Sequence, residues 1–186
     1  MTTIINLIGG PGVGKSTVAT GLFSELKQRK VSAEYVSEYA KELVWEDTQK
    51  LLENQIHVFS EQFRRQYRLL NKVKYVVTDS PLLLNSVYFE YYINKLSDEN
   101  KFFSQEYENL CRKFFDATFN EFENLTFLLY RNKNYDTSGR NQSYDEACEL
   151  DDIIIDKIIS TKNSYVPLYG NEEQNIKTIL NILGEE

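Results

Sequence analysis

Short apolar runs alternate with longer amphipathic stretches along the chain. The five apolar runs are Thr3–Ile8, Ala33–Ser37, Tyr75–Thr78, Leu125–Tyr130 and Tyr165–Leu168. They are rich in β-branched and aromatic residues, which are typical of strands. Because one or more helical stretches separate successive runs, the pattern predicts an α/β fold. We expect a five-stranded parallel sheet that is sandwiched by helices.

The longest amphipathic stretch predicts a helix from about Thr48 to Asn71. Its apolar stripe consists of Leu52, Ile56, Phe59, Phe63, Tyr67 and Leu70. Arg64, Arg65 and Arg68 lie off this stripe. Charges with that spacing usually form a solvated helix face, and we expect the same here.

Two capping sequences mark the starts of later helices. Ser143 followed by Glu146 is a capping box, and Asn171 begins a weaker version of it. The polar segment Arg131–Gln142 has no periodicity, and loops of about 12 residues are often functional. We expect a lid loop there. Neither an internal repeat nor a flexible linker is visible, so we expect a single domain over residues 1–186.

Composition and charge narrow the class of protein. With 186 residues, 41% of them hydrophobic, the chain has enough apolar mass for a continuous core. The net charge of −7 disfavours binding that depends on neutralising nucleic-acid phosphates, although a local basic pocket stays compatible with it. Cys111 and Cys148 are too few for a disulfide framework. No apolar run approaches the ~20 residues of a bilayer span, so we expect a cytoplasmic protein without a membrane partner.

The segment Gly9–Ser16 (GGPGVGKS) fits the pattern GxxxxGK[ST]. It follows an apolar run and precedes the helical stretch Ser16–Lys30, which is the context that this motif requires. Glycines let such a loop surround a polyphosphate with backbone N–H groups, and the helix N-terminus adds positive potential. Lys15 suits the β- and γ-phosphates, and the Ser16 hydroxyl suits Mg²⁺. The predicted nucleotide-binding residues here are Gly10, Gly12, Val13, Gly14, Lys15, Ser16 and Thr17.

Two carboxylates that follow predicted strands are candidates for catalysis. Asp79 ends the run Tyr75–Thr78 as in a Walker B strand, where the acid reaches Mg²⁺ directly or through water. A turn-forming Asp before Ser80 is the alternative. Glu38 follows the second strand, where a carboxylate is able to orient or deprotonate an acceptor hydroxyl, and a first-turn helix acid is its alternative. Either carboxylate suits a general base, and we expect Glu42, one turn further on, to be solvated.

Arginines in the polar segment are candidates for stabilising a transferred phosphoryl group. Arg131 and Arg140 carry the charge that such a group needs, and Gly139 permits a turn that brings Arg140 inward. A solvated basic loop is the alternative interpretation. The predicted catalytic set is Lys15, Glu38, Asp79, Arg131 and Arg140, and the predicted metal ligands are Ser16 and Asp79.

Together these motifs resemble the P-loop kinases of small metabolites, of the nicotinamide riboside kinase type and their nucleoside and nucleotide kinase relatives. The residues that carry the resemblance are Gly9–Thr17, Ser37–Tyr39, Thr78-Asp79 and Asp136–Arg140. The resemblance spans most of the chain and implies a P-loop NTPase fold, ATP with Mg²⁺ as phosphoryl donor, and a mobile lid whose arginines close over the phosphates. It also implies that adenine lies near Gly170 and Asn171, after the last strand.

Three functions fit this sequence. The first is ATP-dependent phosphoryl transfer to a small nucleoside, nucleoside monophosphate or nicotinamide riboside-like acceptor. The second is a kinase of DNA or RNA ends or of modified bases in DNA, which the net charge disfavours. The third is a nucleotide-controlled switch. It is disfavoured because no Glu follows Asp79, and because Tyr135 stands where the guanine-specifying NKxD motif has Asp.

Overall fold

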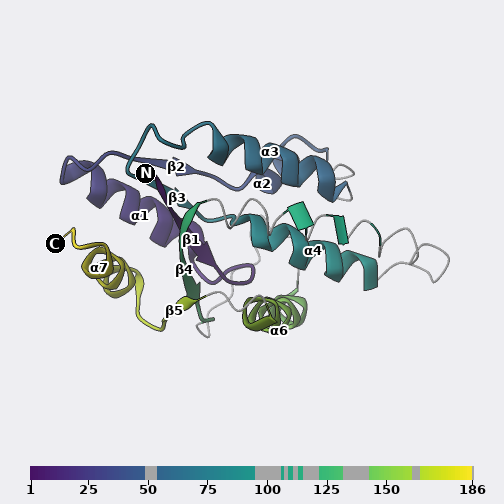
Figure 1. Ribbon diagram of the computed structural model, residues 1–186. Helices are drawn as coiled ribbons and strands as arrows, with labels where there is room; N and C mark the ends of the chain where they lie inside the picture. Colours follow the sequence, from purple (N-terminus) through teal and green to yellow (C-terminus); the bar gives the residue numbers. More distant parts are fainter. Residues whose placement is uncertain are drawn as a thin grey trace.

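Five parallel strands form the centre of the computed structural model (Figure 1). The structure describes residues 1–48, 54–94, 106, 109–110, 113–114, 122–131, 143–160 and 164–185. The strands are β1 (Thr3–Ile8), β2 (Ala33–Val36), β3 (Tyr75–Thr78), β4 (Glu123–Leu129) and β5 (Tyr165–Leu168). They lie in the order β2-β3-β1-β4-β5, and each neighbouring pair is parallel. The predicted five-stranded parallel sheet is confirmed.

The central strand β1 is buried on both faces of the sheet. Ile5 and Leu7 pack into one apolar layer, whereas Ile4 and Ile8 pack on the opposite side. Successive side chains of a strand point to opposite faces, so a strand that is covered on both sides is apolar at nearly every position. For this reason continuous apolar runs, rather than alternating ones, predicted the strands.

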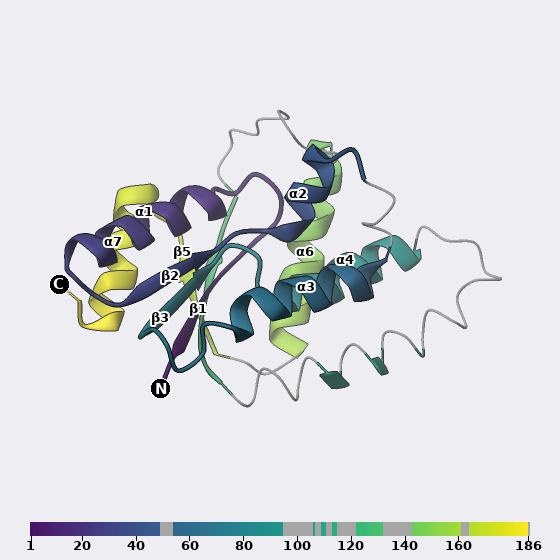
Figure 2. The same ribbon diagram turned by 90° about the horizontal axis from the view of Figure 1, so that it is seen from above.

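Helices cover both faces of the sheet (Figure 2). One face carries α1 (Lys15–Gln28) and α7 (Glu172–Leu183), and the other carries α3 (Gln55–Tyr67), α4 (Leu82–Asn94) and α6 (Tyr144–Ser160). The short helix α2 (Tyr39–Trp45) follows β2. Within the part of the chain that the structure describes, no helix is both long and apolar enough to cross a membrane.

Both predicted caps begin helices. The Ser143 hydroxyl accepts the backbone N–H of Glu146 at 3.2 Å, and the Glu146 carboxylate accepts the N–H of Ser143 at 2.9 Å. Asn171 and Gln174 form the same reciprocal pair at the start of α7. These bonds satisfy N–H groups that have no partner within the helix, which explains why the caps fix the boundaries.

The predicted helix from Thr48 to Asn71 is wrong at both ends. α3 begins after Asn54, whose side chain accepts the backbone N–H of His57 at 3.2 Å, and it ends at Tyr67. Asn71 has a left-handed backbone with φ of 60°. An Asn cap and a left-handed residue both interrupt helical hydrogen bonding, even where apolar residues continue at helical spacing.

The carboxyl ends of the strands meet at one edge of the sheet. The segments that follow β2, β3, β1 and β4 are therefore neighbours there, although they are far apart in sequence. A ligand in an open α/β sheet usually binds at this edge, where the strand order reverses. The fold thus brings the predicted candidates Glu38, Asp79, Lys15 and Arg131 to the same edge of the sheet.

Leu22 of α1 provides a test of this packing, because it is fully buried against the sheet. Leu22→Ala should lower the free energy of unfolding by about 2–5 kcal/mol, since it removes apolar contacts and leaves a cavity. Urea denaturation followed by circular dichroism measures the change. The control is Gln28→Ala at an exposed position of the same helix, which should change it by less than about 0.5 kcal/mol. Equal losses in the two variants would contradict the placement of α1.

Candidate active site

Glycines shape the loop between β1 and α1. Gly12 and Gly14 have φ of 82° and 93°, a left-handed conformation that residues with a Cβ atom disfavour. A Cβ atom at Gly9 would lie 2.8 Å from the carbonyl oxygen of Leu129 in β4. The loop therefore lies tightly against the sheet before it enters α1, whose first N–H groups have no partner within the helix.

Lys15 lies at the start of α1 and turns back over this loop. Its ammonium group donates to the carbonyl oxygens of Gly9 and Gly10, both at 2.8 Å. Burial lowers the pKa of Lys15, while three nearby carboxylates act in the opposite direction. These carboxylates belong to Glu38, Asp79 and Asp151. The Lys15 charge is thus surrounded by acidic groups from three other parts of the fold.

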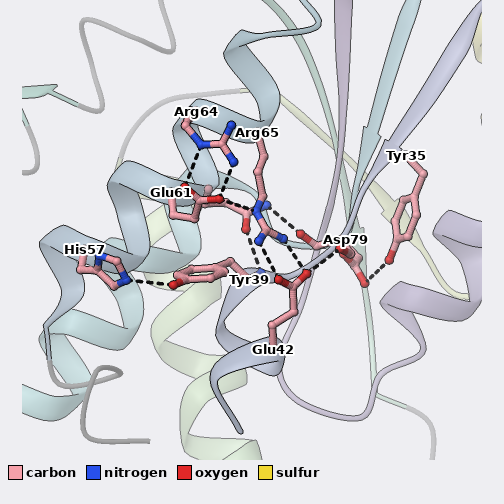
Figure 3. A network of polar contacts seen from close by, with 10 residues as sticks. Tyr35, Tyr39, Glu42, His57, Glu61, Arg64, Arg65 and Asp79 are labelled. Carbon is pink, nitrogen blue, oxygen red and sulfur yellow. Dashed lines mark hydrogen bonds and ion pairs between the residues drawn. The ribbon is translucent and has the colours of Figure 1, made fainter. Parts of the chain in front are cut away.

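Asp79 follows β3 and is 2% exposed. One of its carboxylate oxygens accepts a hydrogen bond from the Tyr35 hydroxyl at 2.8 Å (Figure 3). Burial and the Asp79 carboxylate raise the pKa of Tyr35, so this hydroxyl stays a donor. The other oxygen, Oδ1, is buried and has no hydrogen-bond partner within the described ranges. A buried acceptor without a partner is costly, which indicates that a ligand completes this site.

Asp79 Oδ1 fits a divalent cation. Mg²⁺ takes oxygen ligands, and it is usually held by one or two protein groups together with phosphate oxygens and water. The Ser16 hydroxyl is exposed at the start of α1 and would be the second protein ligand. The donor set therefore suits Mg²⁺ that is bound with a nucleotide.

Glu38 lies between β2 and α2, in a turn that Gln62 of α3 holds from both sides. Gln62 is 1% exposed, accepts the backbone N–H of Tyr39 at 3.0 Å and donates to the carbonyl oxygen of Ser37 at 3.2 Å. Burial raises the pKa of Glu38, and the positive charge of Lys15 only partly offsets this effect. Glu38 occupies the N-cap position of α2, yet its side chain makes no capping hydrogen bond. The carboxylate therefore does not cap the helix through a hydrogen bond.

A network of charged and aromatic side chains joins α2 to α3 beside this turn (Figure 3). Arg65 donates two hydrogen bonds of 2.6 Å to Glu42 and one of 3.0 Å to Glu61. Its guanidinium lies 4.7 Å from the centroid of the Tyr39 ring. Hydrogen bonds from Arg65 lower the pKa of Glu42. The Glu42 side chain is 42% exposed, in line with the expectation of a solvated residue, and it also pairs with a partly buried arginine that α3 brings to it.

Arg131 lies on the other flank of the loop and pairs with Asp151 of α6. Arg131 Nε donates to Asp151 Oδ2 at 2.6 Å, and Asp151 Oδ1 accepts the N–H of Gly10 at 2.9 Å. Its Nη1 and Nη2 atoms donate to the carbonyl oxygens of Pro11 and Ala147, at 2.8 and 3.2 Å. Arg131 therefore contacts the backbone of the glycine-rich loop, and its predicted role in transfer stays a prediction.

The predicted adenine site after β5 has a local structural role. The backbone of Gly170 exchanges two hydrogen bonds of 3.0 Å with the Asn175 side chain, and Asn171 caps α7. The rings of Tyr130 and Tyr169 stack beside it with centroids 4.7 Å apart. Contact of this region with adenine stays a prediction.

The predicted lid cannot be compared with the structure. Residues 132–142, which include Arg140, lie outside the described residues. The lid and the role of Arg140 therefore stay predictions.

The sequence matches a family model described as an AAA domain over residues 4–174. This match covers most of the chain, from β1 to the first turn of α7. The chain belongs to this AAA domain family. The predicted P-loop NTPase fold is thereby confirmed, whereas the nucleotide contacts of Gly9–Ser16 stay a prediction. No curated protein matches the sequence.

Solved structures resemble the fold over nearly its whole length. NadR, crystallised in complex with NR, is 16% identical with a TM-score of 0.76, and the match covers 100% of this chain and 52% of that one. Deoxyadenosine kinase from M. mycoides with bound dATP is 15% identical with a TM-score of 0.65, covering 97% and 99% of the two chains. This chain thus spans about half the length of the NadR chain. At these identities the likeness shows the fold, which is that of P-loop kinases.

The structure adds contacts that the sequence did not indicate, made by Tyr35, Gln62 and Asp151. Tyr35 lies in β2, three residues before Glu38, and this proximity in the sequence was the available signal. Gln62 and Asp151 lie within helices that also carry exposed polar residues. Nothing local in the sequence distinguishes them from such residues.

The opposite pKa shifts of Glu38 and Glu42 predict opposite effects on stability. Because the folded state raises the pKa of Glu38, its ionisation destabilises the fold at neutral pH, and this cost disappears below the pKa of the unfolded chain. Glu38→Gln should therefore raise Tm near pH 8, and the gain should shrink toward pH 4.

Glu42→Gln is the matched control, for which we expect a change in Tm of the opposite sign. The pairing that lowers the pKa of Glu42 is present above the unfolded pKa and is lost as pH falls. This variant should lower Tm near pH 8, and the loss should shrink in acid. Thermal unfolding of the three proteins across this range measures both effects. Changes in Tm that do not vary with pH would contradict the assignment.

Proposed function

We propose that this protein transfers the γ-phosphoryl group of ATP, bound with Mg²⁺, to a hydroxyl group of a small nucleoside-like acceptor. The Glu38 carboxylate is the observation that carries the proposal. It interacts electrostatically with Lys15 and Asp79 at the carboxyl edge of the sheet, and it does not cap the helix that it begins. A carboxylate with this placement suits a general base beside a phosphoryl group.

The donor side of the site follows from the glycine-rich loop. The N–H groups at the start of α1 and the Lys15 ammonium would bind phosphate oxygens, which replace the carbonyl oxygens of Gly9 and Gly10 as partners of Lys15. Ser16 and Asp79 Oδ1 would hold Mg²⁺, which neutralises charge on the β- and γ-phosphates when bound. The Tyr35 hydroxyl fixes the other oxygen of Asp79, so that Oδ1 keeps its direction.

The acceptor side follows from Glu38. Its carboxylate takes the proton of the acceptor hydroxyl while the acceptor oxygen forms a bond to the γ-phosphorus. The bond from that phosphorus to the bridging oxygen breaks, and ADP leaves with the electron pair. The raised pKa of Glu38 makes its carboxylate a stronger base than an exposed glutamate.

The surrounding charges favour a hydroxyl acceptor over a phosphate acceptor. A phosphate beside the Glu38 carboxylate would be repelled unless a cation compensated it. Arg65 is already bonded to Glu42 and Glu61, and Arg64 donates to the same Glu61 at 2.7 Å. NadR in complex with NR and deoxyadenosine kinase support nucleoside-type molecules as the first acceptors to test.

Phosphorylation of a panel of acceptors tests the proposal directly. The protein is incubated with ATP, Mg²⁺ and each of nicotinamide riboside, nucleosides, nucleoside monophosphates and a 5′-hydroxyl oligonucleotide, and products are identified by mass spectrometry. We expect a phosphorylated nucleoside-type product. Lys15→Ala should lower kcat by at least ~100-fold, because a charge that stabilises the transferring group is lost. Transfer to monophosphates alone, transfer to the oligonucleotide alone, or ADP release without an acceptor would overturn the proposal.

Substitutions of Asp79 and Glu38 should impair different properties of the enzyme. Asp79→Asn should raise the Mg²⁺ concentration needed for half-maximal rate, because a neutral amide is a poorer ligand for a hard cation. Glu38→Gln should lower kcat by about 100-fold or more while leaving the Mg²⁺ dependence unchanged. Mg²⁺ titrations of the wild type and both variants measure this. The same metal defect in both variants would show that the roles are assigned incorrectly.

A further inference from the structure

Two charged side chains hold the first half of the glycine-rich loop from outside. Asp151 accepts the N–H of Gly10, and Arg131 donates to the carbonyl oxygen of Pro11 while it pairs with Asp151. The two side chains are only 20% and 9% exposed. The contact therefore belongs to the interior rather than to a solvated lid.

The loop is built around this contact. A Cβ atom at Gly10 would lie 2.1 Å from Asp151 Oδ1 and 2.9 Å from Arg131 Nη2, so a glycine is required there. Pro11 has no backbone N–H, and the N–H of Gly10 is already bonded to Asp151. The N–H groups left for phosphate oxygens therefore come from the second half of the loop and the start of α1.

The charges explain why both residues are needed. Asp151 alone would place a carboxylate beside the site of a polyphosphate, and an unpaired charge there would repel it. Arg131 neutralises this carboxylate at 2.6 Å. Both residues also act electrostatically on Lys15, in opposite directions. The pair thus fixes the backbone of the loop with little net charge at the phosphate site.

We propose that Asp151 and Arg131 are paired positioning residues of the nucleotide site. Asp151 orients the Gly10 peptide, and Arg131 orients Pro11 and neutralises Asp151, so that the loop has its binding shape before the nucleotide arrives. This inference rests on the nucleotide binding of the proposed function and is independent of the acceptor.

Binding of Mg·ADP without an acceptor, measured by isothermal titration calorimetry, tests the pairing. Asp151→Asn should weaken binding several-fold, because the loop is held less firmly. Arg131→Met should weaken it by at least ~10-fold, because it leaves the Asp151 carboxylate unpaired beside the phosphates. The double variant Asp151→Asn/Arg131→Met should bind more tightly than Arg131→Met alone, since it lacks the Asp151 carboxylate that repels the phosphates. Arg131→Lys keeps a positive charge, and its affinity should lie between those of the wild type and Arg131→Met.

The control is another ion pair of α6. Lys157 donates to Glu90 of α4 at 3.0 Å, away from the loop. Glu90→Gln should lower Tm without changing the affinity for ADP, which separates loss of helix packing from loss of loop positioning.

The inference is overturned if the double variant binds as weakly as Arg131→Met, because Arg131 would then act by contacting phosphate itself. It is also overturned if Asp151→Asn or Arg131→Lys binds as the wild type does. A wild-type protein that binds no ADP would instead overturn the proposed function. ADP binding without phosphoryl transfer would leave the pairing supported and only the acceptor chemistry wrong.

Discussion

The glycine-rich loop has almost no side chains with which to fix its own shape, so its geometry depends on charged groups supplied by the rest of the fold. Lys15 holds the carbonyl oxygens of Gly9 and Gly10 from within the site. Asp151 and Arg131 hold the backbone of Gly10 and Pro11 from outside. Glycine lowers the steric cost of such a path but raises its entropic cost, and fixed polar partners offset that cost.

Charges of both signs crowd the carboxyl edge of the sheet. Three carboxylates surround the Lys15 ammonium, and the Arg131 guanidinium is the second cation of the group. Burial raises the pKa of Glu38 and lowers the pKa of Lys15, which are the directions expected when charged groups leave water. The three carboxylates outnumber the two cations. One buried oxygen of Asp79 also has no hydrogen-bond partner among the described residues. A divalent cation that enters with the nucleotide would give this oxygen a partner.

Local signals in the sequence were sufficient for the sheet and the loop. Continuous apolar runs identified all five strands, and Gly9–Ser16 identified the loop, because both signals are read within a few neighbouring residues. The helix from Thr48 was extended too far, since apolar spacing does not report where a cap such as Asn54 redirects the backbone.

Contacts between distant residues could not be predicted in the same way. Asp151 and Gly10 are 141 positions apart, and only the strand order brings them together. The ion pair of Glu42 was missed for the same reason, because its partner Arg65 lies on the next helix. Each of these polar residues is indistinguishable in sequence from a surface residue until the packing of its helix is known.

The packing of one helical layer determines the geometry of both flanks of the site. Gln62 of α3 fixes the turn that carries Glu38, Arg65 of α3 pairs with Glu42 of the following helix, and Asp151 of α6 fixes the glycine-rich loop. Phe59 of α3 and Ile154 of α6 belong to the same buried apolar cluster, which α4 completes on that face of the sheet. Close-packed interiors resist small displacements, so this cluster holds the two flanks at a fixed separation. The separation between the glycine-rich loop and the Glu38 turn is therefore set by apolar residues that belong to neither of them.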